Sequence, residues 1–219
     1  MARAIKKRLR KKVVIVFWEG ESEEQYIKYM RQKFHEKFKI IPYDKKGLFS
    51  TAKKAFGKKG KYCDIKKEID EVWFMFDTEP DMKEKWDEYH KIILQLRKMN
   101  SYMNVRLLMT KSCIEYYFLL HFEKTAPTIV TVNDKEKIKD RLITKYCKAY
   151  KKGDKESIYY IADRYKNAIK NGEWCLKMME DDVGSMCASD ERDKKLFKTE
   201  KTFTTVHEAI QYMENTKIS

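Results

Sequence analysis

Acidic side chains follow two apolar runs of the sequence, and these acids are the residues best suited to chemistry. Val13–Trp18 is followed by Glu19, and Val72–Phe76 is followed by Asp77 and Glu79. Carboxylates gathered in one place repel one another, and a bound divalent cation relieves that repulsion. Oxygen ligands suit Mg²⁺ or Mn²⁺, and the chain has no His/Cys cluster with the spacing of a zinc site. Glu19, Asp77 and Glu79 are therefore candidate metal ligands and catalytic residues.

These three acids can meet only if the two apolar runs form neighbouring strands. Each run is apolar throughout, which is typical of a strand buried on both faces. The carboxyl ends of parallel strands lie at one edge of a sheet, where α/β proteins place their sites. Glu19 would then face Asp77 and Glu79. Ser22 is the expected N-cap of the helix that follows, with Gln25 completing a capping box. The alternative is that Glu19 merely ends a strand and that the acids after it only favour the N-terminus of this helix.

Strands alternate with helices in the first part of the chain. We expect strands over 13–18, 38–43, 72–77 and 104–110, and helices over 23–38, 48–56, 82–99 and 112–123. This alternation predicts an α/β fold with a mainly parallel sheet of about four strands flanked by helices. Beyond residue 124 the pattern is helical, with helices expected over 133–151, 156–171, 172–180 and 205–215. We therefore expect an α/β core with a basic N-terminal arm over 1–124 and a helical region packed on it over 125–219.

The net charge of +14 comes from two segments. Met1–Lys12 holds seven basic residues and no acid, Lys45–Lys61 holds seven lysines and no acid, and the remainder is balanced. Such patches attract nucleic acid through its phosphates. Docking of an acidic protein surface is the alternative. The candidate nucleic-acid-binding residues are Arg8, Arg10, Lys11, Lys53, Lys54, Lys58 and Lys59.

Other features of the sequence favour a cytoplasmic protein with no membrane segment. No stretch approaches the roughly 20 apolar residues of a membrane span. The basic N-terminus leads into a strand and shows no hydrophobic signal sequence. The five cysteines are odd in number and scattered, which indicates reduced thiols and argues against a disulfide framework.

Several stretches of the chain, in the expected order, resemble those of a known family. They are EGESEEQYI (19–27), VWFMFDTE (72–79) and KSCIEYYFLLHFE (111–123), with weaker similarity in KYCKAYKKGD (145–154) and KTFTTVHEAI (201–210). Together they resemble the RloB-like family, which is related to the Toprim fold of topoisomerases, primases and OLD-type nucleases. The resemblance implies a Toprim-like core and a Mg²⁺-dependent nuclease acting on DNA or RNA, tRNA among them. It also implies antiphage defence by abortive infection, with a partner ATPase of the ABC or AAA type.

The resemblance also assigns roles to individual residues. Glu19 matches the glutamate of the first strand, Asp77 the leading aspartate of a DxD-type motif, and Glu79 its second acid. Glu24 matches the last acid of the EGE-x-T-E pattern, and Glu115 matches the glutamate of S-x-x-E-x-W-x-LLHF. Both are therefore further catalytic candidates.

The chain departs from the family pattern at four positions. Glu23 stands where a threonine is usual, and Thr78 stands where an arginine is usual. Glu79 replaces an aspartate, and Tyr117 replaces the common tryptophan. The longer side chain of Glu79 can still bind a metal, but it alters the spacing of the site.

Some candidates have structural alternatives. Glu24 is either part of a second metal site or an exposed first-turn acid that favours the helix dipole. Glu115 is either a site residue or the second half of a capping box begun by Ser112. Lys111 would bind the scissile phosphate from the end of the fourth strand, although an exposed lysine is commoner. His121 lies in an apolar helix, where a buried structural histidine is the expected interpretation.

Two further hypotheses stand beside a metal-dependent nuclease. One is a nucleic-acid-binding module with an inactive site, which would bind in a salt-sensitive but metal-independent way. The other is an interaction subunit whose basic faces contact an acidic partner, such as the ATPase. A homo-oligomer is also compatible with the sequence.

Overall fold

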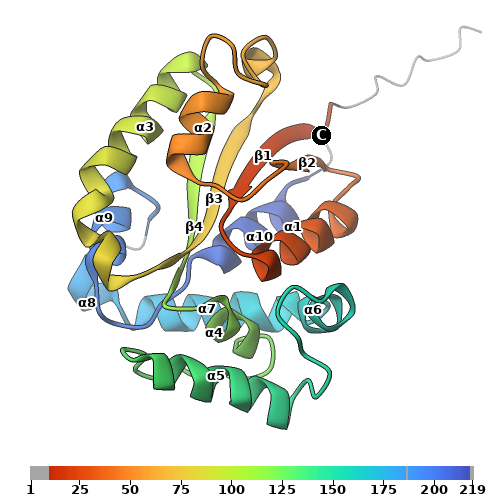
Figure 1. Cartoon of the computed structure of the whole chain (residues 1–219), viewed down its shortest axis with the longest axis vertical. Helices are drawn as coiled ribbons and strands as arrows, with labels where there is room; N and C mark the ends of the chain where they lie inside the picture. The colour runs from red at the N-terminus through yellow and green to blue at the C-terminus, as the bar shows by residue number, and fades with distance from the viewer. Residues whose placement is uncertain (1–9, 186, 218–219) are drawn as a thin grey trace, which may run out of the picture.

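A parallel sheet forms the centre of the computed structural model, which describes residues 10–185 and 187–217 (Figure 1). Its strands are β1 (Lys12–Trp18), β2 (Phe38–Pro42), β3 (Glu71–Thr78) and β4 (Asn104–Lys111). They lie in the order β2-β1-β3-β4, and each neighbouring pair is parallel. The predicted four-stranded parallel sheet is therefore confirmed, and β1 and β3 are neighbours.

Helices cover both faces of this sheet, which explains why the strands are apolar at nearly every position. On one face, a single hydrophobic cluster joins the strands to α1 (Glu21–Lys33), α4 (Ile114–Leu119) and α10 (Val206–Asn215), and it extends outward to α5 (Val132–Lys145), α6 (Lys155–Ala162) and α7 (Tyr165–Lys177). The other face packs against α2 (Phe49–Ala55), α3 (Trp86–Met99) and α9 (Asp190–Lys198). The short elements are η1 (Lys66–Glu68), η2 (Pro80–Lys85) and α8 (Glu180–Val183).

The alternation of side chains along β3 decides which groups reach each face. Trp73 and Met75 lie in the hydrophobic cluster of the α1 face, whereas Phe74 and Phe76 lie in that of the α3 face. Continuing this alternation places Asp77 on the α1 face and the next residue on the α3 face. Lys111 is in register with that next residue, Thr78, so it also belongs to the α3 face.

The C-terminal helical half contributes to both hydrophobic clusters. Leu142 and Ile210 lie in the cluster of the α1 face, and Phe197 lies in that of the α3 face. At the outer edge of the sheet Thr204 forms an isolated antiparallel bridge with Thr110 of β4. No helix in the described ranges is long and apolar enough to cross a membrane.

Two predicted capping boxes are wrong, because both serines bind distant parts of the chain. Helix α1 begins after Gly20, and the Ser22 hydroxyl accepts a hydrogen bond from the main-chain N–H of Gly153. Helix α4 begins after Cys113, and the Ser112 hydroxyl donates to the carbonyl of Ile129.

Some element boundaries also differ from prediction. The helix expected over 112–123 is only Ile114–Leu119, and the helix expected over 156–171 is divided between α6 and α7. The predicted helix 82–99 opens with the 3₁₀ segment η2.

Candidate functional site: an acid cluster at the ends of β1 and β3

The carboxyl ends of β1 and β3 bring the predicted acids to one edge of the sheet. Trp18 is in register with Met75, so Glu19 follows β1 beside the last residues of β3. Partial burial raises the pKa of Glu19, the main-chain N–H of Asp77 opposes that rise, and the Glu79 charge adds to it. The proximity of Glu19, Asp77 and Glu79 that the sequence predicted is therefore present. We refer to Glu19, Glu23, Asp77, Glu79 and Glu115 as the acid cluster.

Asp77 is the residue on which the cluster converges. Burial raises its pKa well above the usual value, and the charges of Glu23, Glu115, Glu19 and Glu79 raise it further, in that order. These electrostatic contributions require all four other acids to lie near its carboxyl group. Asp77 is therefore placed where a cation would interact with the most carboxylates at once.

Glu23 is a member of the cluster that the sequence did not identify. It is only 3% exposed, and burial followed by the charges of Glu115 and Glu19 raises its pKa to about 7, while Lys152 opposes the rise. Gly20 makes its position possible, because a Cβ at residue 20 would lie 2.4 Å from Glu23 Oε2. The sequence feature that could have identified Glu23 is its departure from the family pattern, in which a threonine is usual at this position.

Two oxygens of the cluster lack the partner that buried polar atoms normally have. Glu23 Oε2 and Asp77 Oδ1 are both buried and accept no hydrogen bond. An unsatisfied buried polar atom costs about 1–3 kcal/mol, more when charged, so each needs an explanation such as a bound ion. Glu115 differs, because its Oε1 accepts a hydrogen bond of 2.8 Å from the Tyr150 hydroxyl.

Two lysines from the C-terminal half approach the cluster. The Lys135 ammonium lies 2.5 Å from Glu79 Oε1 in a half-buried ion pair. Lys152 lowers the pKa of both Glu19 and Glu23, which places its charge near both of them. Lys152 precedes Gly153, whose N–H binds Ser22, so this contact between loop and helix also positions the lysine.

The structure does not bring Lys111 or Glu24 to the acid cluster. Lys111 is buried on the α3 face, where its ammonium donates to the Thr199 carbonyl at 2.9 Å and pairs with Glu200 at 3.2 Å. Glu24 pairs with Lys28 at 2.8 Å on the outside of α1. Its charge is not among those that shift the pKa of Glu19, Glu23 or Asp77.

His121 has the structural environment that its apolar helix suggested. Its Nε2 accepts a hydrogen bond from the Tyr26 hydroxyl at 3.0 Å, and its Nδ1 donates to the Tyr117 carbonyl at 3.0 Å. Burial lowers its pKa to about 3, so the imidazole is neutral at ordinary pH.

The candidate nucleic-acid-binding residues lie in two separate regions. Arg8 is outside the described residues, whereas Arg10 and Lys11 are exposed immediately before β1. Arg10 donates to the Glu68 carbonyl at 2.6 Å and pairs with Asp70 at 3.3 Å. The second region lies on and after α2 and contains the exposed residues Lys53, Lys54, Lys58 and Lys59.

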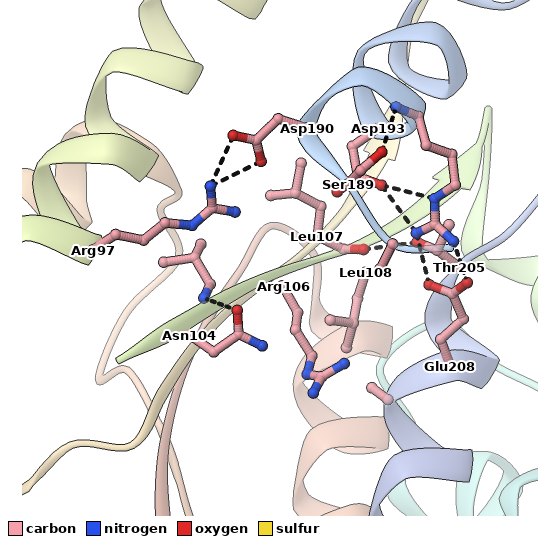
Figure 2. Close-up of a pocket in the computed structure, with 14 residues that line it drawn as sticks. Arg97, Asn104, Arg106, Leu107, Leu108, Ser189, Asp190, Asp193, Thr205 and Glu208 are labelled. Carbon is pink, nitrogen blue, oxygen red and sulfur yellow. Dashed lines mark hydrogen bonds and ion pairs between the residues drawn. The ribbon is translucent and has the colours of Figure 1, made fainter. Parts of the chain in front are cut away.

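A small cavity beside β4 is occupied by ion pairs and is separate from the acid cluster (Figure 2). Its volume is about 80 Å³, and none of the five clustered acids lines it. Arg97 pairs with Asp190 at 2.8 Å, and Arg192 pairs with Glu208 at 2.6 Å. These pairs join α3, α9 and α10 around the edge of the sheet, which is a structural role.

The donor atoms of the acid cluster suit a hard divalent cation. All five acids offer carboxylate oxygens, and two of those oxygens are buried without partners. Over residues 10–185 and 187–217, however, no group of three or more His, Cys, Asp or Glu side chains is arranged to hold a metal ion. Ligation would therefore require these carboxylates to move toward one point.

Comparison with known proteins places this chain in a family. The model of the RloB-like protein family matches residues 14–213, which include the whole sheet apart from its first residues and nearly all the helices. The chain therefore belongs to the RloB-like family. No curated protein and no solved structure matched the chain.

Proposed function

We propose that this protein is a metal-dependent nuclease that hydrolyses phosphodiester bonds of DNA or RNA. The observation that supports this most strongly is the convergence of Glu19, Glu23, Glu79 and Glu115 on Asp77. A protein has no structural reason to concentrate carboxylates that raise one another's pKa, and such groups mark functional sites. Membership of the RloB-like family supports the same assignment.

The chain's own residues would perform distinct tasks. Glu19, Asp77 and Glu79 would hold Mg²⁺ or Mn²⁺, with Glu23 adding a fourth carboxylate beside Asp77. Such an ion, when bound, neutralises charge on the phosphoryl group and acidifies a water molecule. Glu115, fixed by the Tyr150 hydroxyl, would orient the neighbouring carboxylates. Lys152, exposed beside Glu19 and Glu23, would contact a phosphate oxygen of the substrate.

The biological role follows from the family resemblance alone. We propose that the protein is the effector of an antiphage system and that a partner ATPase restrains it until infection. Unrestrained cleavage of host nucleic acid would harm the cell, which gives the restraint a purpose.

A cleavage assay with Asp77→Asn tests the proposed function. Purified protein is incubated with DNA and RNA in Mg²⁺, Mn²⁺ or EDTA, beside Asp77→Asn and the control Asp140→Asn, which changes an exposed acid of α5. We expect metal-dependent cleavage by the wild type and the control, and a loss of at least 100-fold in Asp77→Asn, comparable to removing about 2.7 kcal/mol of transition-state stabilisation.

Calorimetry with Mg²⁺ or Mn²⁺ covers the case in which the isolated protein needs its partner to cleave. We expect the wild type and Asp140→Asn to bind the metal and Asp77→Asn to bind it at least tenfold more weakly. A wild-type protein that neither cleaves nor binds a metal would refute the proposal. It would favour the second candidate, a nucleic-acid-binding subunit, which the separate basic regions support.

A further inference from the structure

A wide basic groove runs along β2, the edge strand of the sheet that lies beside β1. Its volume is about 1120 Å³, and its walls come from β2, α1 and the start of α6. No acidic residue lines it. Six cationic residues do, and they are Arg10, Lys11, Lys28, Arg31, Lys39 and Lys155.

Most of these cations are free to meet an external anion. Lys11, Arg31 and Lys39 are exposed and form no ion pair with any acid of the described chain. Arg10 and Lys28 each pair with one acid that lies outside the groove lining, Asp70 and Glu24. A concave surface with this excess of positive charge focuses the electrostatic field and therefore attracts a polyanion.

The groove also offers an aromatic surface and polar groups. Tyr159 is half-buried, with its ring edge-on to Tyr29 at 5.5 Å, and the Lys155 ammonium lies 5.4 Å from its centroid. Gln25 and Gln32 of α1 add amide donors and acceptors to the wall. Basic grooves that contain aromatic rings are typical of surfaces that bind single-stranded nucleic acid.

The groove and the acid cluster share two structural elements. Helix α1 carries Glu23 on its buried side and Arg31 on its exposed side. The segment 152–155 connects Lys152, whose charge acts on Glu19 and Glu23, to Lys155, which lines the groove. A strand that follows the positive charge along the groove would thus approach the carboxylates past Lys152.

We propose that the β2 groove binds a single strand of nucleic acid through its phosphates and directs it toward the acid cluster. This inference rests on the proposed function, because it identifies the surface that holds the nuclease's substrate. It adds Lys28, Arg31, Lys39 and Lys155 to the binding residues that the basic N-terminal segment predicted. The charged and aromatic lining favours nucleic acid over an acidic protein segment.

Equilibrium binding in EDTA tests the groove without requiring cleavage. Fluorescein-labelled oligo(dT) and oligo(U) of about 20 nucleotides, longer than a typical single-strand site, are titrated with protein at several salt concentrations. The variant Arg31→Gln/Lys39→Gln/Lys155→Gln removes three exposed charges without breaking an ion pair. The control Lys98→Gln/Lys170→Gln/Lys177→Gln removes three exposed charges from α3 and α7.

The salt dependence distinguishes phosphate contacts from general charge. Each phosphate contact to a single strand contributes about 0.7 to the slope of log K against log salt, so losing three should reduce the slope by about 2. We expect this reduction, with at least tenfold weaker binding, in the groove variant, and much smaller changes in the control.

Poly-glutamate is titrated in the same way as an acidic-protein probe. Three results would overturn the proposal: no oligonucleotide binding by the wild type, equal losses in both variants, or a groove variant that loses poly-glutamate binding but keeps oligonucleotide binding. The last would assign the groove to an acidic protein partner. Because no divalent metal is present, these results are independent of the cleavage assay. A protein that binds through the groove but neither cleaves nor binds a metal would refute only the nuclease.

Discussion

Replacing Glu23 by glutamine should make the protein more stable at alkaline pH in the absence of metal. Glu23 is 3% exposed and lies among carboxylates that raise its pKa from 4.5 to about 7. Its folded-state pKa is thus higher than its unfolded-state pKa, so the folded protein retains a proton that the unfolded chain releases. The stability of the wild type is therefore unaffected below about pH 4.5, falls as the pH rises to about 7, and is then constant.

The size of this effect follows from the shift in pKa. A rise from 4.5 to about 7 corresponds to about 3 kcal/mol, at about 1.4 kcal/mol for each pKa unit. About 2–3 kcal/mol of this is lost between pH 5 and pH 8, and Glu23→Gln escapes that loss because glutamine does not ionise. The gain in the variant should fall toward the higher figure, since a neutral residue 23 lowers the pKa of Asp77 and so reduces the stability that Asp77 itself loses as the pH rises. Any cost of burying the glutamine amide is present at both pH values and cancels in the comparison.

Urea unfolding in EDTA at pH 5 and pH 8 measures this difference directly. The matched control is Glu24→Gln, the adjacent acid of α1, which pairs with Lys28 on the helix surface. Its effect should stay below about 1 kcal/mol and change little between pH 5 and pH 8. The compared quantity is the free energy of unfolding of Glu23→Gln minus that of the wild type. If this difference were equal at both pH values, or less favourable to the variant at pH 8 than at pH 5, the electrostatic account of the cluster would be refuted.

Three further outcomes follow from the same geometry. Gly20→Ala should reduce cleavage at least tenfold, because the new Cβ would displace the Glu23 carboxylate, while its backbone φ of −117° suits alanine; circular dichroism checks that the variant is folded. Lys111→Met should lower the free energy of unfolding by about 1–3 kcal/mol, since the Thr199 carbonyl loses its buried donor, yet leave the specific activity of folded protein unchanged. Mg²⁺ at 100 times its dissociation constant should stabilise the wild type at pH 8 by about 2.7 kcal/mol and should stabilise Asp77→Asn much less. Thermal unfolding with and without Mg²⁺ measures this difference.

Hydrophobic patterning was sufficient to predict the sheet because its strands are buried on both faces. An apolar run such as Val72–Phe76 can bury the side chains of both its faces only between two layers of helices. The alternation of strands and helices along the chain provides those layers. The meeting of Glu19 and Asp77 then depended on one fact that no local pattern contains, the pairing of β1 with β3. The family resemblance pointed to the same acids independently.

Local sequence patterns could not predict the roles of residues whose partners are distant in the sequence. Ser22 and Ser112 have the spacing of capping residues, but Gly153 and Ile129 provide their hydrogen bonds. Glu23 reads as an ordinary first-turn acid, and only the folded chain shows that its carboxylate turns toward Asp77. Lys111 ends a strand beside the site, yet the register of β4 directs it to the opposite face of the sheet.

Under the proposed function, the charges of this protein divide the handling of a phosphodiester between two places. Five carboxyl groups and two nearby lysines leave the acid cluster with an excess of negative charge, which repels a phosphate unless a cation is bound. The β2 groove has the opposite sign and needs no cation to attract the same substrate. Substrate binding should therefore survive EDTA, whereas cleavage should not. A protein whose binding and cleavage were lost together on metal removal would have its main substrate contacts at the acid cluster, not along β2.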